Sequence, residues 1–158
     1  MNGGMAVLLA FGIGAVAGLR SMTAPAVTAW AAHLGRLDLQ NSALAFMGSK
    51  WAAGIFTLAA LGELVADQLP MTPARTKPGP LAARIVMGGL CGACIVVAAG
   101  GAAWLGAVAG GIGGFVGAFA GYRARMGLVQ SLHVPDAAIA VPEDLIAIGL
   151  GILLVTRL

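Results

Sequence analysis

The feature that most constrains the fold is an apolar run from residue 81 to residue 122, in which Arg84 is the only charged residue. A single helix of that length would measure about 60 Å, roughly twice the thickness of the hydrocarbon core of a bilayer. The run must therefore fold back on itself. We expect the turn at Gly100-Gly101, which is followed by Trp104 at an interfacial position. The run predicts two consecutive membrane spans.

Charged residues are too scarce in this chain to cover a surface that faces water. They make up 9% of its 158 residues, against about a quarter in soluble domains, while hydrophobic residues make up 59%. A helix of about 20 apolar residues can cross a bilayer. We therefore predict an all-α, polytopic transmembrane helical bundle of about five spans, built as one integral membrane domain over residues 1–158. The predicted spans are residues 3–19, 49–69, 80–99, 103–122 and 137–156.

Two segments depart from this regular pattern. Residues 21–35 are less apolar than their neighbours and contain Pro25 and His33, so we predict an interfacial or re-entrant helix there. In the last span, Pro142 followed by two acids is typical of a helix start. Residues 137–141 are then predicted to supply the remaining depth in a non-helical form, which membranes tolerate only where protein or a wet cavity surrounds the backbone.

Glycines at intervals of four residues predict close helix packing. Small residues at this spacing form a groove on one helix face, into which the backbone of another helix can settle. The pattern leaves open whether that other helix belongs to the same chain or to a second subunit. The predicted packing residues are Gly14, Gly18, Gly88, Gly92, Gly106, Gly110, Gly114, Gly117 and Gly121.

Residues 15–22 resemble residues 118–126, because both contain Ala-Gly, a large apolar residue and Arg after a glycine-rich run. In a five-span layout these two helices cross the membrane in opposite directions. Halves of opposite direction are typical of inverted-repeat transporters. Two interpretations fit the likeness: related inverted halves, or two glycine-rich helix ends of similar composition.

The basic residues do not indicate an orientation. Lys and Arg usually concentrate in cytoplasmic loops, but here both sides of the five-span layout carry similar numbers. Arg20, Arg36, Lys50 and Arg157 fall on one side, and Arg75, Lys77, Arg84, Arg123 and Arg125 fall on the other. This balance is compatible with insertion in both directions and with an antiparallel homo-oligomer. Basic residues scattered at the ends of apolar runs indicate contact with membrane lipids and argue against nucleic acid.

Two acids on the second predicted span are the leading functional candidates. Glu63 and Asp67 lie one turn apart on a mostly apolar helix, and ionisable groups in a span usually face an interior or a wet cavity. Such a pair could share a proton or bind a cation. The alternative is that both acids lie near the interface and pair with Arg75 or Arg84 for assembly.

Other charged residues are candidates for binding a solute, an ion or a lipid. Arg20 and Arg123 each end a glycine-rich span, where an arginine either reaches the lipid headgroups or forms an anion site. Glu143 and Asp144 are further candidates for binding a solute or an ion. The opening of the third span combines basic and hydroxyl side chains that suit a phosphate or lipid headgroup, although a solvated loop explains them equally. These residues are Arg75, Thr76, Lys77 and Arg84.

Catalytic chemistry has little support in the sequence. It contains no nucleophile-elbow, phosphate-loop or zinc-protease motif, and the spacing of His33 and His133 is not that of metal ligands. Cys91 and Cys94 fall inside an apolar run, which favours small packing residues over a redox pair. We therefore predict no enzyme activity, no cofactor and no metal.

Three short runs carry a resemblance to a known family. They are Gly-Leu-Arg-Ser-Met-Thr-Ala-Pro-Ala-Val at residues 18–27, Gly-Glu-Leu-Val-Ala-Asp-Gln-Leu-Pro at 62–70 and Thr-Pro-Ala-Arg-Thr at 72–76. They resemble a family of small bacterial membrane proteins known only as domain of unknown function 4126. The resemblance covers most of the chain and implies a multi-pass protein of the inner (plasma) membrane. It implies no activity and no catalytic residues.

Two functions fit these observations. The first is an oligomeric transporter or channel for a small solute or a lipid-linked substrate, in which Glu63 and Asp67 couple to a cation. The second is a non-transporting membrane module that assembles with a partner through its glycine-rich helix faces.

Overall fold

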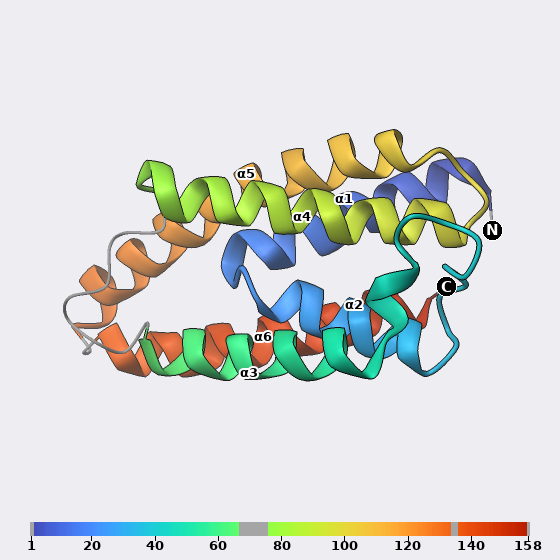
Figure 1. Ribbon diagram of the computed structural model, residues 1–158. Coiled ribbons are helices and arrows are strands. Elements are labelled where there is room, and N and C mark those ends of the chain that lie inside the picture. The colour runs from blue at the N-terminus through green and yellow to red at the C-terminus, as the bar shows by residue number, and fades with distance from the viewer. Residues whose placement is uncertain (1, 67–75, 134–135, 158) are drawn as a thin grey trace.

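The computed structural model describes residues 2–66, 76–133 and 136–157, and for residues 136–138 it describes the backbone alone. Within these ranges every regular element is helical, as predicted (Figure 1). The helices are α1 (Gly3–Leu19), α2 (Thr23–His33), the short 3-10 helix η1 (Ala45–Gly48), α3 (Lys50–Ala66), α4 (Pro78–Ala98), α5 (Ala103–Leu132) and α6 (Asp136–Thr156).

Three of these helices contain segments long and apolar enough to cross a bilayer: Pro78–Ala98, Ala103–Leu132 and Ile139–Thr156. Helix α1 is equally apolar but shorter, at 17 residues. The chain is therefore an integral membrane protein. Of the five predicted spans, three reach full length within the described residues, and the predicted second span is described only as far as Ala66, with residues 67–69 outside the described ranges.

The helices form two layers (Figure 1). Helices α1, α4 and α5 pair with one another through the most extensive contacts in the molecule, and we call them the glycine layer. Helices α2, α3 and α6 form the other layer, which we call the outer layer. Helix α2 contacts members of both layers, and most of its residues are buried. The N- and C-terminal ends of the chain lie at the same end of the bundle.

Glycine brings the three helices of the glycine layer together at backbone distance. A Cβ atom added at Gly14 or Gly88 would collide with the backbone of Gly110, and one added at Gly92 would collide with the backbone of Gly106. Such collisions involve main-chain atoms, which cannot rotate out of the way as a side chain can. Close backbone approach in this layer therefore requires glycine.

The remaining predicted packing residues lie in the same layer. Gly18 faces the backbone of α5 near Ala118, Gly114 faces the backbone of Arg84, and Gly117 faces Ala15. Gly121 is buried on α5. All nine glycines thus lie on helices that pack against each other within one chain.

The turn between α4 and α5 falls at Gly100-Gly101, the predicted position. Gly100 adopts a φ of 76°, in the left-handed region where glycine has no steric penalty. The amide N–H groups of Gly100 and Gly101 donate to the carbonyl groups of Val97 and Val96 and close the end of α4.

The bounds of the fifth predicted span, residues 137–156, agree with α6 to within one residue, but the predicted end of the fourth span and the predicted conformation at the start of the fifth were wrong. Helix α5 does not end at Tyr122 but continues to Leu132, because the intervening residues include good helix formers and no proline. Helix α6 begins at Asp136, so residues 137–141 are helical and Pro142 lies inside the helix instead of starting it. Pro142 has no backbone N–H, so the helix lacks one hydrogen bond at this position. The residues before Pro142 form a helix readily enough to tolerate that loss.

The predicted opposite direction of the two similar segments was also wrong. Gly14 lies beside Gly110, and Gly18 lies beside Gly114 and Ala118, so α1 and α5 run parallel. The reason is that α2 runs back along the bundle from the end of α1 and adds one reversal of direction (Figure 1). The likeness between residues 15–22 and 118–126 is therefore not one of inverted halves.

Replacing Gly14 by alanine should destabilise the glycine layer, because the new methyl group meets the backbone of Gly110. Overpacking of this kind costs about 1–3 kcal/mol. The matched control is Gly54→Ala on α3, where an added Cβ meets nothing within 4 Å. Unfolding in detergent should show a loss of stability for Gly14→Ala and no loss for Gly54→Ala. Equal stability of the two variants would contradict the backbone-contact explanation.

Candidate functional site

Three arginines of the glycine layer turn their side chains into the protein. Arg20 follows the last residue of α1 and is fully buried, and Arg84, near the start of α4, is 4% exposed. The Arg125 side chain, on α5, is 12% exposed. Arginine is almost never buried without a partner. Each of these three guanidinium groups has a carboxylate beside it.

Arg20 pairs with Asp144, with its Nη2 atom in direct contact with Asp144 Oδ1. The pairing joins the end of α1 to the third turn of α6. Arg20 therefore does not extend to the lipid headgroups, which was one of its two predicted roles. Its position follows from α1 ending inside the bundle, where the chain turns back into α2 (Figure 1).

Arg84 is held at three points. Its Nε atom donates to the carbonyl of Gly18 at 3.1 Å, and its Nη1 atom donates to the carbonyl of Pro80 at 3.2 Å. The Nη2 atom lies 3.6 Å from Glu63 Oε1. The first contact depends on glycine packing, because it is the close approach of α1 that brings the Gly18 carbonyl within reach. Arg84 is thus oriented by backbone groups toward the carboxylate of Glu63.

The Glu63 carboxylate lies at the break between α1 and α2. Its Oε1 atom accepts hydrogen bonds from the Ser21 amide at 2.9 Å and the Ser21 hydroxyl at 2.7 Å. Its Oε2 atom accepts one from the Met22 amide at 2.8 Å. Free amides at a helix start favour a negative charge. Glu63 supplies that charge to α2, whose own residues provide no side-chain cap.

The third ion pair joins α5 to α6. Arg125 Nη1 on α5 is 3.4 Å from Glu143 Oε2 on α6. Glu143 and Asp144 are adjacent in the sequence, which places the Arg125 pair beside the Arg20 pair. Arg20 and Ser21 are also adjacent, and Ser21 contacts Glu63, the partner of Arg84, so the three pairs form one continuous group across the bundle. We call this group the charge network: Arg20, Ser21, Glu63, Arg84, Arg125, Glu143 and Asp144.

Charge in the network is segregated by layer. The arginines of the three pairs come from α1, α4 and α5, which are the members of the glycine layer. The acids come from α3 and α6, which belong to the outer layer. Among the described residues, these three pairs join three guanidinium groups to three carboxylates. Each pair therefore links the two layers electrostatically.

The structure brings together several of the predicted site residues. Glu63, Arg20, Arg84, Glu143 and Asp144 all belong to the charge network. Glu63 contacts Arg84, which the assembly interpretation of the acids had offered as one partner. Asp67 and Arg75 lie outside the described residues. Arg123 and Lys77 are exposed, and Thr76 is half-buried just before α4.

Sequence reasoning missed two members of the charge network, Arg125 and Ser21. The signal for Arg125 was present in the glycine spacing, since Gly117, Gly121 and position 125 follow one another at four-residue intervals on α5. Arg123 is two positions from Gly121 and points to the opposite side of the helix, because each residue turns an α-helix by about 100°. Ser21 carried no comparable signal, because its role depends on α2 starting beside α3.

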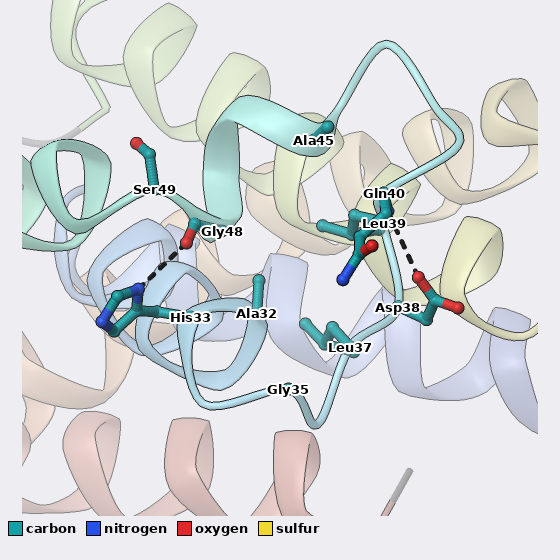
Figure 2. Close-up of a pocket in the computed structure, with 10 residues that line it drawn as sticks. All are labelled: Ala32, His33, Gly35, Leu37, Asp38, Leu39, Gln40, Ala45, Gly48 and Ser49. Atoms are coloured by element: carbon teal, nitrogen blue, oxygen red, sulfur yellow. Dashed lines mark hydrogen bonds between the residues drawn. The ribbon is translucent and has the colours of Figure 1, made fainter.

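A separate pocket of about 560 Å³ lies at the other end of α2 (Figure 2). The loop between α2 and α3 lines most of it. Two hydrogen bonds join residues that line the pocket. His33 Nδ1 is 3.0 Å from the Gly48 carbonyl, and the backbone amide of Gln40 donates to Asp38 Oδ1 at 3.2 Å. Helix α2, about 16 Å long, separates this pocket from the charge network. We therefore take the charge network as the candidate functional site.

The part of the chain that the structure describes contains neither a disulfide nor a cluster of metal-ligand side chains. Within these ranges no three His, Cys, Asp or Glu side chains come together as a metal ion would require. Cys91 and Cys94 are both free and completely buried among the helices, so they act as small packing residues.

These features define a small, multi-pass helical membrane protein with a balanced set of charges in its interior. The family model described as Domain of unknown function (DUF4126) matches residues 7–156, and the chain belongs to this family. This confirms the resemblance carried by the three short runs. No curated protein and no solved structure matches the chain.

The direct contact between Arg20 and Asp144 should appear as an energetic coupling between the two residues. In a double-mutant cycle, Arg20→Gln with Asp144→Asn should give a coupling energy of about 1–3 kcal/mol, because each single change removes the direct ion-pair partner of the other buried residue. Arg20→Gln with Asp38→Asn removes equivalent charges but should couple by less than about 0.5 kcal/mol, because Asp38 is exposed in the loop after α2 and lies outside the charge network. Unfolding in detergent measures both cycles. Equal coupling in the two cycles would refute the pairing of Arg20 with Asp144.

Proposed function

We propose that the protein is a membrane transporter for a small solute, in which the glycine layer and the outer layer move relative to each other and the charge network acts as the gate between them. The observation that carries this proposal is the segregation of charge, with the arginines in one layer and the acids in the other. Every pair in the network must open if the layers separate. Ion pairs that bridge two packed units are typical of elements with two alternative arrangements.

Energetics support a functional role for the network. A charged side chain at the centre of a membrane helix costs about 2.5–3.5 kcal/mol on insertion scales. Buried ion pairs add little net stability compared with apolar residues of the same volume. Close packing of small residues, which holds α1, α4 and α5 together, would join the layers without buried charge. Six charged side chains, each at most 12% exposed, therefore favour a function that uses them.

The two layers differ in rigidity, as such a movement requires. Backbone contacts between glycines hold α1, α4 and α5 together and permit little adjustment. By contrast, α3 packs mainly on α2, and among its described residues Ala53 is the buried one. Movement of α3 and α6 against the glycine layer would exchange partners within the charge network. Protons or cations would compensate the acids and anions would compensate the arginines as the pairs open.

The alternative function, a non-transporting assembly module, depended on glycine faces available to a partner. Those faces pack within the chain, on α1, α4 and α5. The exposed side chains of α3, such as Trp51, Ile55 and Leu58, suit lipid as well as protein. The residues that favoured an assembly module are therefore used internally, and transport is the stronger proposal.

Distance measurements between spin labels test the movement without knowledge of the solute. Labels at Leu61→Cys on α3 and Val86→Cys on α4 occupy exposed positions in different layers. They would be introduced together with Cys91→Ala and Cys94→Ala, and the protein would be studied in lipid nanodiscs. We expect a minor second distance in the wild-type background, at about 0.1–10%. Arg84→Gln should raise its population several-fold, because Glu63 then loses its guanidinium partner.

The control uses two labels within the glycine layer, at Val86→Cys and Ile112→Cys, both exposed. This pair should report one unchanged distance in every background. A single, identical distance distribution for the Leu61–Val86 pair, with and without Arg84→Gln, would overturn the proposed movement.

A further inference from the structure

We infer that the position of the Glu63 carboxylate is a binding site for a small oxyanion, a carboxylate or a phosphate, and that Glu63 occupies it as an internal substitute in this state. The anion would be the solute of the proposed transporter, so this inference deepens that function and rests on it for transport. The binding site itself is argued from the groups that surround Glu63 and can be tested separately.

Donors from two different segments converge on this one carboxylate. Arg84 contributes a buried guanidinium from α4, and Ser21 contributes its amide and its hydroxyl from the break after α1. The Met22 amide completes the set. A guanidinium together with backbone amides and a hydroxyl is the donor set that proteins use for carboxylates and phosphates.

These donors keep their places without Glu63. Two other nitrogens of Arg84 are bonded to the carbonyl groups of Gly18 and Pro80, so its orientation does not depend on the acid. Ser21 is 7% exposed and lies between the buried residues Arg20 and Thr23. The site is therefore preorganised by the backbone of the glycine layer and by the α1–α2 break.

Glu63 itself is the removable part. It reaches the site from near the end of α3, a helix that packs mainly on α2, and 12% of its side chain is exposed. The Glu63 side chain can leave by rotating away at the end of α3, while Arg84 and Ser21 remain in the interior. Its departure removes one negative charge from beside the Arg84 guanidinium and the amides of Ser21 and Met22. An incoming anion would restore a negative charge at this position.

The test compares binding of acetate and inorganic phosphate to the wild-type protein and to Glu63→Gln in detergent, through the rise in unfolding temperature with each sodium salt. Sodium chloride at equal ionic strength is the reference. Glu63→Gln should bind about tenfold or more tightly than the wild type, because a site that is free for about 0.1–10% of the time loses affinity in proportion. Adding Arg84→Gln to Glu63→Gln should abolish the anion effect.

Glu143→Gln is the matched control, because it removes the same charge from the acid that pairs with Arg125. It should not raise affinity as Glu63→Gln does. Equal gains from the two variants would overturn the site in favour of a general excess of positive charge. Failure of acetate and phosphate to stabilise Glu63→Gln, in detergent and in nanodiscs containing phosphatidic acid, would also overturn it.

Nanodiscs with and without phosphatidic acid distinguish the source of the anion. Stabilisation of Glu63→Gln by this lipid, but not by free phosphate or acetate, would assign the oxyanion to a lipid headgroup; the reverse would assign it to a free solute. If the anion binds but the Leu61–Val86 distance never changes, the site stands and the transport proposal fails. If the distance changes and no anion binds, the transport proposal stands and this inference fails.

Discussion

Backbone contact between α1, α4 and α5 is the constraint on which the rest of the molecule depends. At Gly14, Gly88 and Gly110 there is no room even for a methyl group. Lipid tails are as apolar as leucine, so helices in a bilayer gain little from burying apolar side chains and associate through close packing and polar contacts. Glycine allows that packing here, and it brings carbonyl groups such as that of Gly18 within reach of a neighbouring arginine.

The charge network follows from this packing. The backbone fills the space between α1, α4 and α5. The side chains of Arg20, Arg84 and Arg125 therefore extend from the edges of the glycine layer toward the outer layer. There the low dielectric makes an uncompensated charge costly, and each arginine lies beside an acid of α3 or α6. The same arrangement supplies the α2 start with a carboxylate that its own residues lack. The contacts of the charge network therefore hold the two layers together and also form the candidate functional site.

Much of the helical pattern could be predicted from residue types. Apolar runs located α1 and α4 to within about two residues, and the Gly100-Gly101 turn was placed correctly because glycine accepts a positive φ without strain. The errors concern the start of the last helix and the direction of α5. Pro142 is typical of a helix start, but it lies inside α6, because the residues before it form a helix readily enough to tolerate the lost hydrogen bond. The direction of α5 was wrong because α2 adds a reversal that composition does not reveal.

By itself the sequence determined the membrane environment, the helical class, the glycine faces and the presence of costly charges such as Glu63 and Arg84, because these depend on hydropathy and spacing along one helix. Only the tertiary structure decided that the glycine faces meet within the chain, that Arg125 and not Arg123 joins the charge network, and that every pair bridges the two layers. Those outcomes depend on which helix lies beside which and on its direction. A periodic pattern states which residues share a face, but the partner of that face is set by contacts between residues distant in the chain.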